Sequence, residues 1–110
     1  MKIKIRIENE VHILEFEGSL DAQTWKTAQA EFDNLIDHGQ KKILVNFKNL
    51  PYISSLGLRV LLDISKKLKA VNGELRVCDL SSVVKEVFET SGFNSILNVF
   101  QSESEALESF

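Results

Sequence analysis

Two adjacent serines, Ser54 and Ser55, are the residues of this chain whose position best supports chemistry. They follow a loop and directly precede leucines at helical spacing, so they are expected at the N-terminus of a helix. The first N–H groups of a helix lack intrahelical partners and its dipole is positive at this end, which favours an anion. A phosphate on either hydroxyl would therefore be tolerated, whereas in the simplest interpretation the serines only cap the helix.

The segments around the serines alternate between strand and helix patterns. The apolar run at 43–47 predicts a strand that is buried on both faces, and the leucines predict a helix from about 55 to 71. Charged and apolar residues alternate at the start of the chain and predict two strands that form a hairpin through Asn9-Glu10. The remaining pattern predicts a helix that is capped by Asp21 and ends at Gly39, a strand at 74–79, a helix that begins at Ser81-Ser82 and ends at Ser91-Gly92, a strand at 95–100 and a helix at 103–110.

This order of elements predicts an α/β fold with a single mixed β-sheet of about five strands and about four helices. The sheet is expected to begin with the N-terminal hairpin, and right-handed crossovers are expected to join the later strands. The chain has 110 residues, of which 44% are hydrophobic and 26% are charged. This composition suits one domain that spans residues 1–110.

Charge and hydropathy argue against several classes of function. The formal net charge of −3 provides no basic field to hold a polyanion, so nucleic-acid binding is not expected. No apolar run approaches the length of a membrane span, and charged residues interrupt the N-terminal segment where a signal peptide would be apolar. We therefore expect a cytoplasmic protein without a membrane partner. The only cysteine, Cys78, stands in an apolar strand, where a buried structural role is expected.

The patterns of an enzyme active site are missing from the sequence. A nucleophilic serine needs a base that a third group orients, and the only imidazoles, His12 and His38, are expected in a strand and at the C-terminal end of a helix. The serine pair also lacks the preceding glycine of a nucleophile elbow, and neither a glycine-rich phosphate loop nor metal-ligand spacing occurs. We therefore expect a protein that is not an enzyme and holds no cofactor.

The run from Tyr52 to Val60 resembles the signature of the STAS domains, and within them of the bacterial anti-sigma factor antagonists. That signature is a hydrophobic pair, Asp-Ser-Ser or Asp-Ser-Ala, then Gly-Leu and a small residue. The resemblance extends along nearly the whole chain, because residues 18–21 match the family's Gly-x-Leu-Asp and residues 45–47 and 73–78 match two of its strands. The resemblance implies the STAS fold.

The same resemblance aligns Ser55 with the serine that is phosphorylated in the family, and it implies a switch between partners. Unphosphorylated, such a protein binds an anti-sigma factor that is also an ATP-dependent serine kinase; phosphorylated on Ser55, it releases that partner. A metal-dependent serine phosphatase restores binding, so the ATP and the metal belong to the partners. The signature differs at three places here: Ser54 stands where Asp is usual, Leu56 where Ser or Ala is usual, and Arg59 where a small residue is common.

Partner contacts are expected around Ser55, at Asp21, Ser54, Leu56, Gly57, Arg59 and Val60. Leu56 and Val60 belong to a second apolar row on the helix, beside the row that supplies its core face. We expect Leu56 to remain partly exposed and to dock a partner, and Val60 to be partly exposed with a mixed role in core and docking; burial of this row beneath the third helix and the sheet is the alternative. Arg59 is placed to engage a carboxylate of the partner or the phosphate itself.

Two other functions remain open from the sequence. The first is a STAS subunit of a lipid-transport ATPase or a scaffold complex, which binds its partner constitutively and in which Ser55 is only structural. The residues that differ from the usual signature, Ser54, Leu56 and Arg59, favour this alternative. The second is a small-ligand or nucleotide-binding module, which the absence of a glycine-rich phosphate loop disfavours.

Overall fold

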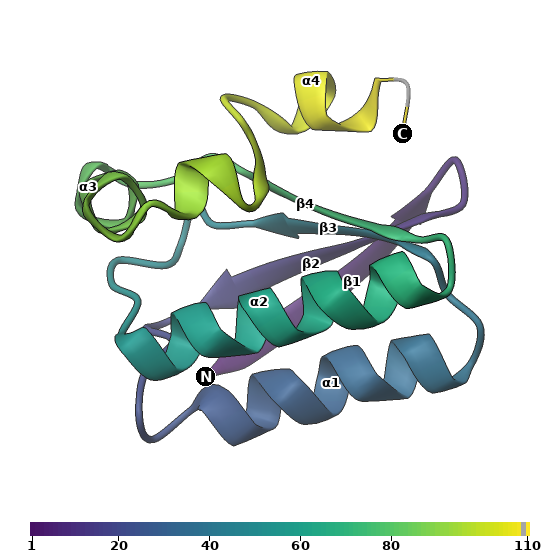
Figure 1. Ribbon diagram of the computed structural model, residues 1–110, viewed down its shortest axis with the longest axis horizontal. Coiled ribbons are helices and arrows are strands. Elements are labelled where there is room, and N and C mark those ends of the chain that lie inside the picture. The colour runs from purple at the N-terminus through teal and green to yellow at the C-terminus, as the bar shows by residue number, and fades with distance from the viewer. Residues whose placement is uncertain (109) are drawn as a thin grey trace.

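The computed structural model describes residues 1–108 and 110, and a five-stranded mixed β-sheet forms its centre (Figure 1). The strands lie in the order in which they occur in the sequence. The first two are antiparallel and form the expected hairpin, whereas each later strand is parallel to the one before it. The strands are β1 (Lys2–Glu8), β2 (Val11–Glu17), β3 (Lys42–Asn46), β4 (Glu74–Cys78) and β5 (Asn98–Phe100).

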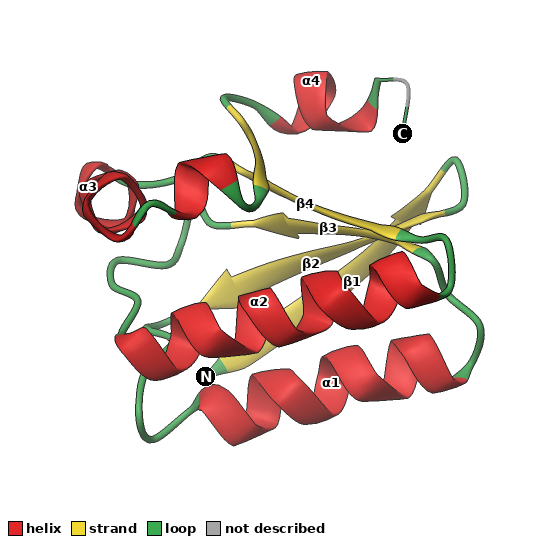
Figure 2. Cartoon of the chain, in the orientation of Figure 1, coloured by secondary structure: helices red, strands yellow, loops and turns green. Residues whose placement is uncertain are grey.

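Helices cover both faces of this sheet (Figure 2). The helices α1 (Trp25–Asp37) and α2 (Ser55–Ala70) lie side by side on one face, and the short α4 (Glu103–Leu107) lies on the other. A third helix, α3 (Ser82–Ser91), and the 3₁₀ turn η1 (Phe93–Ser95) connect β4 to β5 beside the end of the sheet. Within residues 1–108 and 110, no helix has the length and apolar content that are needed to cross a membrane.

The hydrophobic core consists of two buried clusters, one on each face of the sheet. Ile43 and Val45 of β3 point into the larger cluster and Leu44 points into the smaller one, so this strand is buried on both faces, as the sequence predicts. Four phenylalanine rings pack one against the next through the larger cluster, with centroids of neighbouring rings 5.9 to 6.3 Å apart, in the order Phe32, Phe16, Phe47 and Phe88. The smaller cluster lies under α4 and contains Val11, Ile13, Leu44, Cys78 and Ala106.

The first helix begins later than the sequence predicts. The prediction places Asp21 at its N-cap, but α1 starts at Trp25, with Thr24 in the N-cap position. Asp21 instead forms a separate turn: its Oδ1 accepts a hydrogen bond from the Gln23 N–H (3.0 Å), and its own N–H donates to the Thr24 hydroxyl oxygen (3.0 Å). A short carboxylate side chain can bond a turn as well as a helix end, and here the turn is formed.

The last strand is shorter than predicted, because β5 covers only 98–100 of the expected 95–100. Gly92 takes a left-handed conformation with φ of 80°, which ends α3 and leads directly into η1. Leu97 then enters the larger cluster, where it is 4% exposed. The turn and this buried leucine take up the residues that the sequence assigns to the start of the strand.

The last helix also ends early, at Leu107 rather than at residue 110. Glu108 has an extended backbone (φ −67°, ψ 136°), and Arg76 on β4 donates hydrogen bonds to the carbonyl oxygens of Ala106 and Glu108, both at 2.9 Å. The Arg76 guanidinium also lies 4.3 Å from the centre of the Phe110 ring, which packs against the smaller cluster. The hydrogen bonds from Arg76 hold the backbone at Glu108 outside the helix. Position 109 lies outside the described residues.

An isolated β-bridge joins the segment after β2 to the loop before α2. Leu20 and Ile53 form this bridge, in which the Leu20 N–H donates to the Tyr52 carbonyl (3.1 Å) and the Ser54 N–H donates to the Leu20 carbonyl (2.9 Å). Leu20 and Ile53 are both buried. The bridge therefore fixes the start of α2 relative to the turn that contains Asp21.

Gly57, in the first turn of α2, packs directly on this bridge. A Cβ atom at this position would lie 2.8 Å from the carbonyl oxygen of Leu20 and equally close to side-chain carbons of Leu20 and Ile53. Non-bonded heavy atoms in a packed interior have their optimal separation at about 3.5 to 4.0 Å, so a side chain here would clash. The absence of a side chain at Gly57 therefore allows α2 to lie against the bridge.

Gly57→Ala should destabilise the fold by about 1 to 3 kcal/mol, because the added methyl group meets a backbone carbonyl that cannot move aside freely. Without this clash alanine would be the better helix former, by about 1 kcal/mol. The free energy of unfolding from chemical denaturation checks this, with Lys66→Ala at an exposed position of the same helix as the control. A Gly57→Ala variant as stable as the control would contradict the close packing of α2 on the bridge.

Candidate functional site

Ser54 has the geometry of a helix N-cap. Its backbone is extended (φ −93°, ψ 175°), and its Oγ accepts a hydrogen bond from the Gly57 N–H (3.4 Å). Its carbonyl oxygen accepts the first intrahelical bond, from the Leu58 N–H (2.9 Å). Serine and aspartate are both good N-caps, so a serine can fill this structural role at the position where the STAS signature usually has an aspartate.

Ser55 is the first residue of α2, and it is exposed. Within the described residues its hydroxyl takes part in no hydrogen bond, and the N–H groups of Ser55 and Leu56 have no acceptor. Two free N–H groups and the positive end of the helix dipole therefore lie beside a hydroxyl that is open to solvent. The two serines have different environments, although they are adjacent in the sequence.

Of the six residues that the sequence proposes as partner contacts, Val60 and Gly57 are buried, and the other four are at least partly accessible. Leu56 is partly exposed and Arg59 is exposed, whereas Val60 is only 2% exposed. The prediction that Val60 remains partly exposed is wrong, because α1 packs beside α2 and covers this row of the helix. Ile64, one turn later in the same row, is fully buried, and Gly57 is buried against the bridge.

A small groove lies between the N-terminal halves of α1 and α2, next to the serine pair along α2. The volume of this groove is about 200 Å³. Trp25 belongs to it, although the periodicity of the first helix assigns this residue only to the core-facing stripe. The sequence does not indicate the groove, because it depends on how two separate helices pack. Its lining residues are Trp25, Gln29, Leu56, Arg59, Val60 and Asp63.

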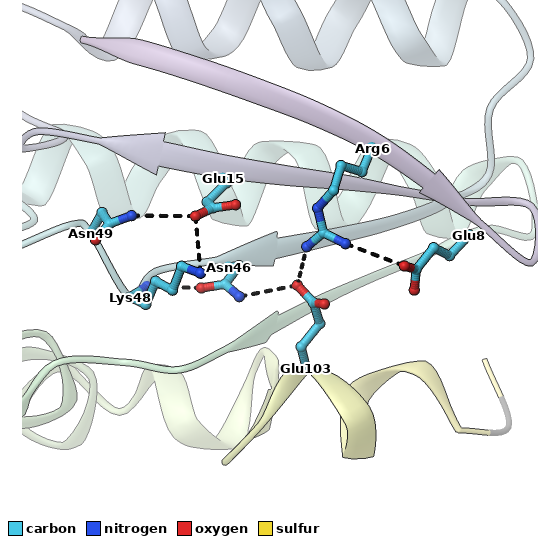
Figure 3. Close-up of polar contacts among 7 residues, drawn as sticks. All are labelled: Arg6, Glu8, Glu15, Asn46, Lys48, Asn49 and Glu103. Carbon is cyan, nitrogen blue, oxygen red and sulfur yellow. Dashed lines mark hydrogen bonds and ion pairs between the residues drawn. The ribbon is translucent and has the colours of Figure 1, made fainter.

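Glu103 on α4 supports the loop between β3 and α2 from the face of the sheet that lies opposite α1 and α2 (Figure 3). Its carboxylate accepts hydrogen bonds from the side-chain amide of Asn46 (3.1 Å) and from the guanidinium of Arg6 (2.6 Å). Asn46 Oδ1 in turn accepts a hydrogen bond from the Lys48 N–H (2.9 Å), at the start of the loop. These three hydrogen bonds link β1, α4 and the end of β3 to one another.

Glu15 on β2 forms a second anchor for the same loop (Figure 3). Its Oε1 accepts a hydrogen bond from the side-chain amide of Asn49 (3.3 Å) and lies 3.3 Å from the ammonium group of Lys48. Further along the loop, Leu50 is fully buried, and the Ser81 hydroxyl donates to its carbonyl oxygen (3.5 Å). The loop that leads to the serine pair is therefore fixed at several points.

The surroundings of Glu103 lower the pKa of its carboxyl group. Partial burial alone would raise this pKa, but hydrogen bonds from Asn46 and Arg6, together with the positive charges of Arg6 and Lys48, outweigh it. The hydrogen bond to Glu103 also raises the pKa of the Arg6 guanidinium. Glu103 is thus ionised at neutral pH, and its ionised form stabilises the folded chain.

The histidines and the cysteine lie away from the serine pair. His12 is at the start of β2, and His38 is the C-cap of α1, where its Nδ1 lies 2.7 Å from the carbonyl oxygen of Asn34. Cys78 is fully buried, and this burial raises the pKa of its thiol. The neighbouring Asp79 raises this pKa further. Across residues 1–108 and 110, no three His, Cys, Asp or Glu side chains are grouped so that they could hold a metal ion.

Comparison with known families identifies the fold and its relatives. A model of the STAS domain matches residues 2–106, nearly the whole chain. The chain belongs to the STAS domain family. Among its relatives, a Bordetella bronchiseptica protein named as the anti-sigma factor antagonist BtrV is 39% identical over 94 residues, which cover 86% of this chain and 81% of that protein. The resemblance to the STAS family in the sequence is confirmed.

Solved structures share the fold of this STAS domain. The crystal structure of a Thermotoga maritima protein named as an anti-sigma factor antagonist has a TM-score of 0.92 at 22% identity, and the match covers 96% of this chain and 92% of that one. The Bacillus protein SpoIIAA in its phosphorylated form has a TM-score of 0.73 at 24% identity, with 97% of each chain covered. These similarities confirm the predicted STAS-like α/β class with one mixed five-stranded sheet.

Glu103→Gln should lower the stability of the STAS domain at neutral pH by on the order of 1 kcal/mol, because a neutral amide weakens the contact with Arg6. The pKa of Glu103 in the folded chain lies below the ordinary value of 4.5, so its contribution is complete above that value and is lost as the pH falls through the folded pKa. The stability difference between wild type and variant should therefore shrink below pH 4.5. Urea unfolding at several pH values measures this difference.

The matched control for this change is Glu105→Gln, which removes an exposed carboxylate from the same short helix. This control should differ little from the wild type in stability at any of these pH values. If the loss of stability in Glu103→Gln were equally large at the most acidic pH at which the protein stays folded, the role of the ionised carboxylate would be contradicted.

Proposed function

We propose that this STAS domain is an anti-sigma factor antagonist that switches partners through phosphorylation of Ser55. Unphosphorylated, it binds an anti-sigma factor that is also an ATP-dependent serine kinase, and thereby frees the regulated sigma factor. Phosphorylation of Ser55 releases the kinase, and a serine phosphatase restores binding. The name of the Bordetella bronchiseptica relative supports the general role, and the phosphorylated form of SpoIIAA supports a phosphate on a protein of this fold.

The different use of the two adjacent serines is the observation that carries this proposal. The Oγ of Ser54 accepts a hydrogen bond from the helix backbone, whereas the hydroxyl of Ser55 is exposed and has no partner in the described part of the chain. A kinase needs a hydroxyl that it can reach and that the fold does not require. Ser55 meets both conditions, and Ser54 serves as the cap.

A phosphate on Ser55 would be compatible with the fold. It would carry about 1.5 to 2 negative charges at pH 7, and it would lie beside the free N–H groups of Ser55 and Leu56 at the positive end of the α2 dipole. Inside a packed protein interface the same charge is bulky and costly to desolvate. The fold therefore persists after phosphorylation, while the affinity for the kinase falls.

The surface around Ser55 has residue types that are common at protein interfaces. Tyr52 is 48% exposed just before the serine pair, and Arg59 is exposed one turn after it. The Asp21 turn lies beside this surface, because the bridge through Leu20 joins it to the loop. We assign the partner contact to these residues, with Ser54 and Gly57 shaping the first turn of the helix and Leu56 and Val60 forming the adjacent groove.

One observation favours a constitutive partner as the second candidate function. The apolar side chains of Leu56 and Trp25 at the groove would also suit a permanent contact, as in a STAS subunit of a lipid-transport ATPase or a scaffold complex. In that case the Ser55 hydroxyl would be dispensable, and the partner would stay bound whatever the phosphorylation state. The response to a kinase therefore separates the two functions.

Incubation with a cognate kinase and ATP should place a single phosphate on Ser55. The probes are the anti-sigma factor kinases encoded in the same genome, each purified and tested in turn, and mass spectrometry maps the modified residue. Ser55→Ala should abolish incorporation without loss of stability. Ser54→Ala should still be phosphorylated but should be less stable by about 1 kcal/mol, because it loses the cap.

The pair Ser81-Ser82 is an internal control for this experiment. Ser81 caps α3 by accepting a hydrogen bond from the Val84 N–H (3.2 Å), and Ser82 is the exposed first residue of that helix, as Ser55 is of α2. A kinase that recognises the surface around Ser55 leaves Ser82 unmodified. Phosphate on Ser54 or Ser82 instead, or none with a kinase that binds, would contradict the assignment.

Ser55→Asp should weaken kinase binding by on the order of 1 to 3 kcal/mol, because it adds an unpaired carboxylate to the interface. The melting temperature should change little, since an acidic residue in the first turn complements the helix dipole. Ser82→Asp makes the same local change on α3 and should bind as the wild type does. Calorimetry and thermal melts measure both properties. If the two variants bound the kinase equally well, the interface would lie elsewhere. If Ser55→Asp lost the fold, the hydroxyl of Ser55 would be needed for folding.

A further inference from the structure

The groove between the N-terminal halves of α1 and α2 has an apolar interior. Val60, which is 2% exposed, forms its floor, and the partly buried Trp25 and Leu56 form its walls. Its volume of about 200 Å³ lies below the range of about 300 to 1,000 Å³ that is usual for small-molecule pockets. A space of this size suits one large side chain of another protein better than a free ligand.

Positive charge lies around the mouth of this groove. Arg59 lines it, is exposed, and has no ion pair or hydrogen bond within the described residues. Lys26 lies nearby, with its ammonium group 5.7 Å from the centre of the Trp25 ring. The one carboxylate among the lining residues, that of Asp63, lies 3.2 Å from the ammonium group of Lys67, which also pairs with Asp33 at 2.9 Å. Three cations, Arg59, Lys26 and Lys67, thus stand against these two carboxylates. The local charge is therefore positive although the whole chain carries −3, and a complementary partner presents negative charge here.

We propose that the groove receives an acidic, amphipathic segment of the anti-sigma factor. One large apolar side chain of that segment occupies the space over Val60, between Trp25 and Leu56, and a neighbouring carboxylate pairs with Arg59. Tryptophan and arginine are among the residues that most often carry binding energy at protein interfaces, and a guanidinium can hold a carboxylate through two parallel hydrogen bonds. This inference rests on the proposed function and specifies the chemistry of its partner.

The arrangement also gives a physical reason for phosphate on Ser55 to oppose binding. Ser55 and Arg59 are four residues apart on α2, so they lie on the same side of the helix and one turn apart. A phosphate on Ser55 can pair with the Arg59 guanidinium and compete with the carboxylate of the partner. Its own charge also repels an acidic segment. Phosphorylation thereby reverses the sign of the surface that the partner contacts.

Charge reversal at Arg59 tests the acidic contact. The probe is the kinase that phosphorylates the chain, and calorimetry measures its affinity for the unphosphorylated protein at several salt concentrations. Arg59→Glu should weaken binding at least tenfold and reduce its salt dependence, without a change in melting temperature. Lys69→Glu makes the same change of charge at an exposed position near the C-terminal end of the same helix, and should bind within twofold of the wild type.

Trp25 reports directly on the groove, because it is the only tryptophan of the chain. Protein labelled with 5-fluorotryptophan has a single ¹⁹F resonance, and this resonance should shift when the unphosphorylated chain binds the kinase. It should not shift when the Ser55-phosphorylated chain is mixed with the kinase at the same concentrations. This measurement separates occupation of the groove from binding at another surface.

Three results would overturn the inference. If the kinase binds wild type and Arg59→Glu equally well and leaves the ¹⁹F resonance in place, the partner uses another surface and the proposed function stands. If the resonance shifts with the concentration of the chain alone, a second copy occupies the groove. If no anti-sigma factor kinase binds the wild type, the proposed function and this inference fail together.

Discussion

The contact between Gly57 and the bridge of Leu20 with Ile53 is the constraint on which the rest of the site depends. It lets the first turn of α2 lie against the backbone of the segment that follows β2, because no side chain stands between them. The turn at Asp21 and the start of α2 are consequently joined through the backbone of Leu20, although they are far apart in the sequence. The spacing of these groups is set by backbone contacts, which leaves the exposed side chains free to serve recognition.

Much of the fold follows from the sequence, because periodicity and capping act over a few residues. The prediction of a helix from about 55 to 71 agrees with the observed Ser55–Ala70, and Ser81 and Gly92 bound α3 as the pattern indicates. The start of α1 is predicted incorrectly, because the side chain of Asp21 can bond a turn or a helix end equally well. The choice depends on the Thr24 hydroxyl, which binds back to the Asp21 N–H.

The candidate site is only partly predictable, because much of it depends on packing between distant segments. The cap formed by Ser54 follows from the place of the serine pair at a helix start, whereas phosphorylation of Ser55 stays a prediction from the resemblance to the family. The burial of Val60 does not follow from the sequence, since an apolar row on one helix does not reveal that α1 covers it. Glu103 and Asn46, which are hydrogen-bonded, are 57 residues apart in the sequence. Trp25 lines the groove because two separate helices pack together. Neither contact leaves a periodic signal in the sequence.

The bridge between Leu20 and Ile53 makes the surface around Ser55 a property of the folded molecule alone. It joins Leu20 and Ile53, which are far apart in the sequence, so it exists only where the folded chain brings these two segments together. In a nascent or unfolded chain the serine pair is an ordinary flexible peptide, with no helix end, groove or neighbouring turn. Under the proposed switch, a kinase that recognises the assembled surface would spare such chains, and its phosphate would mark only folded molecules.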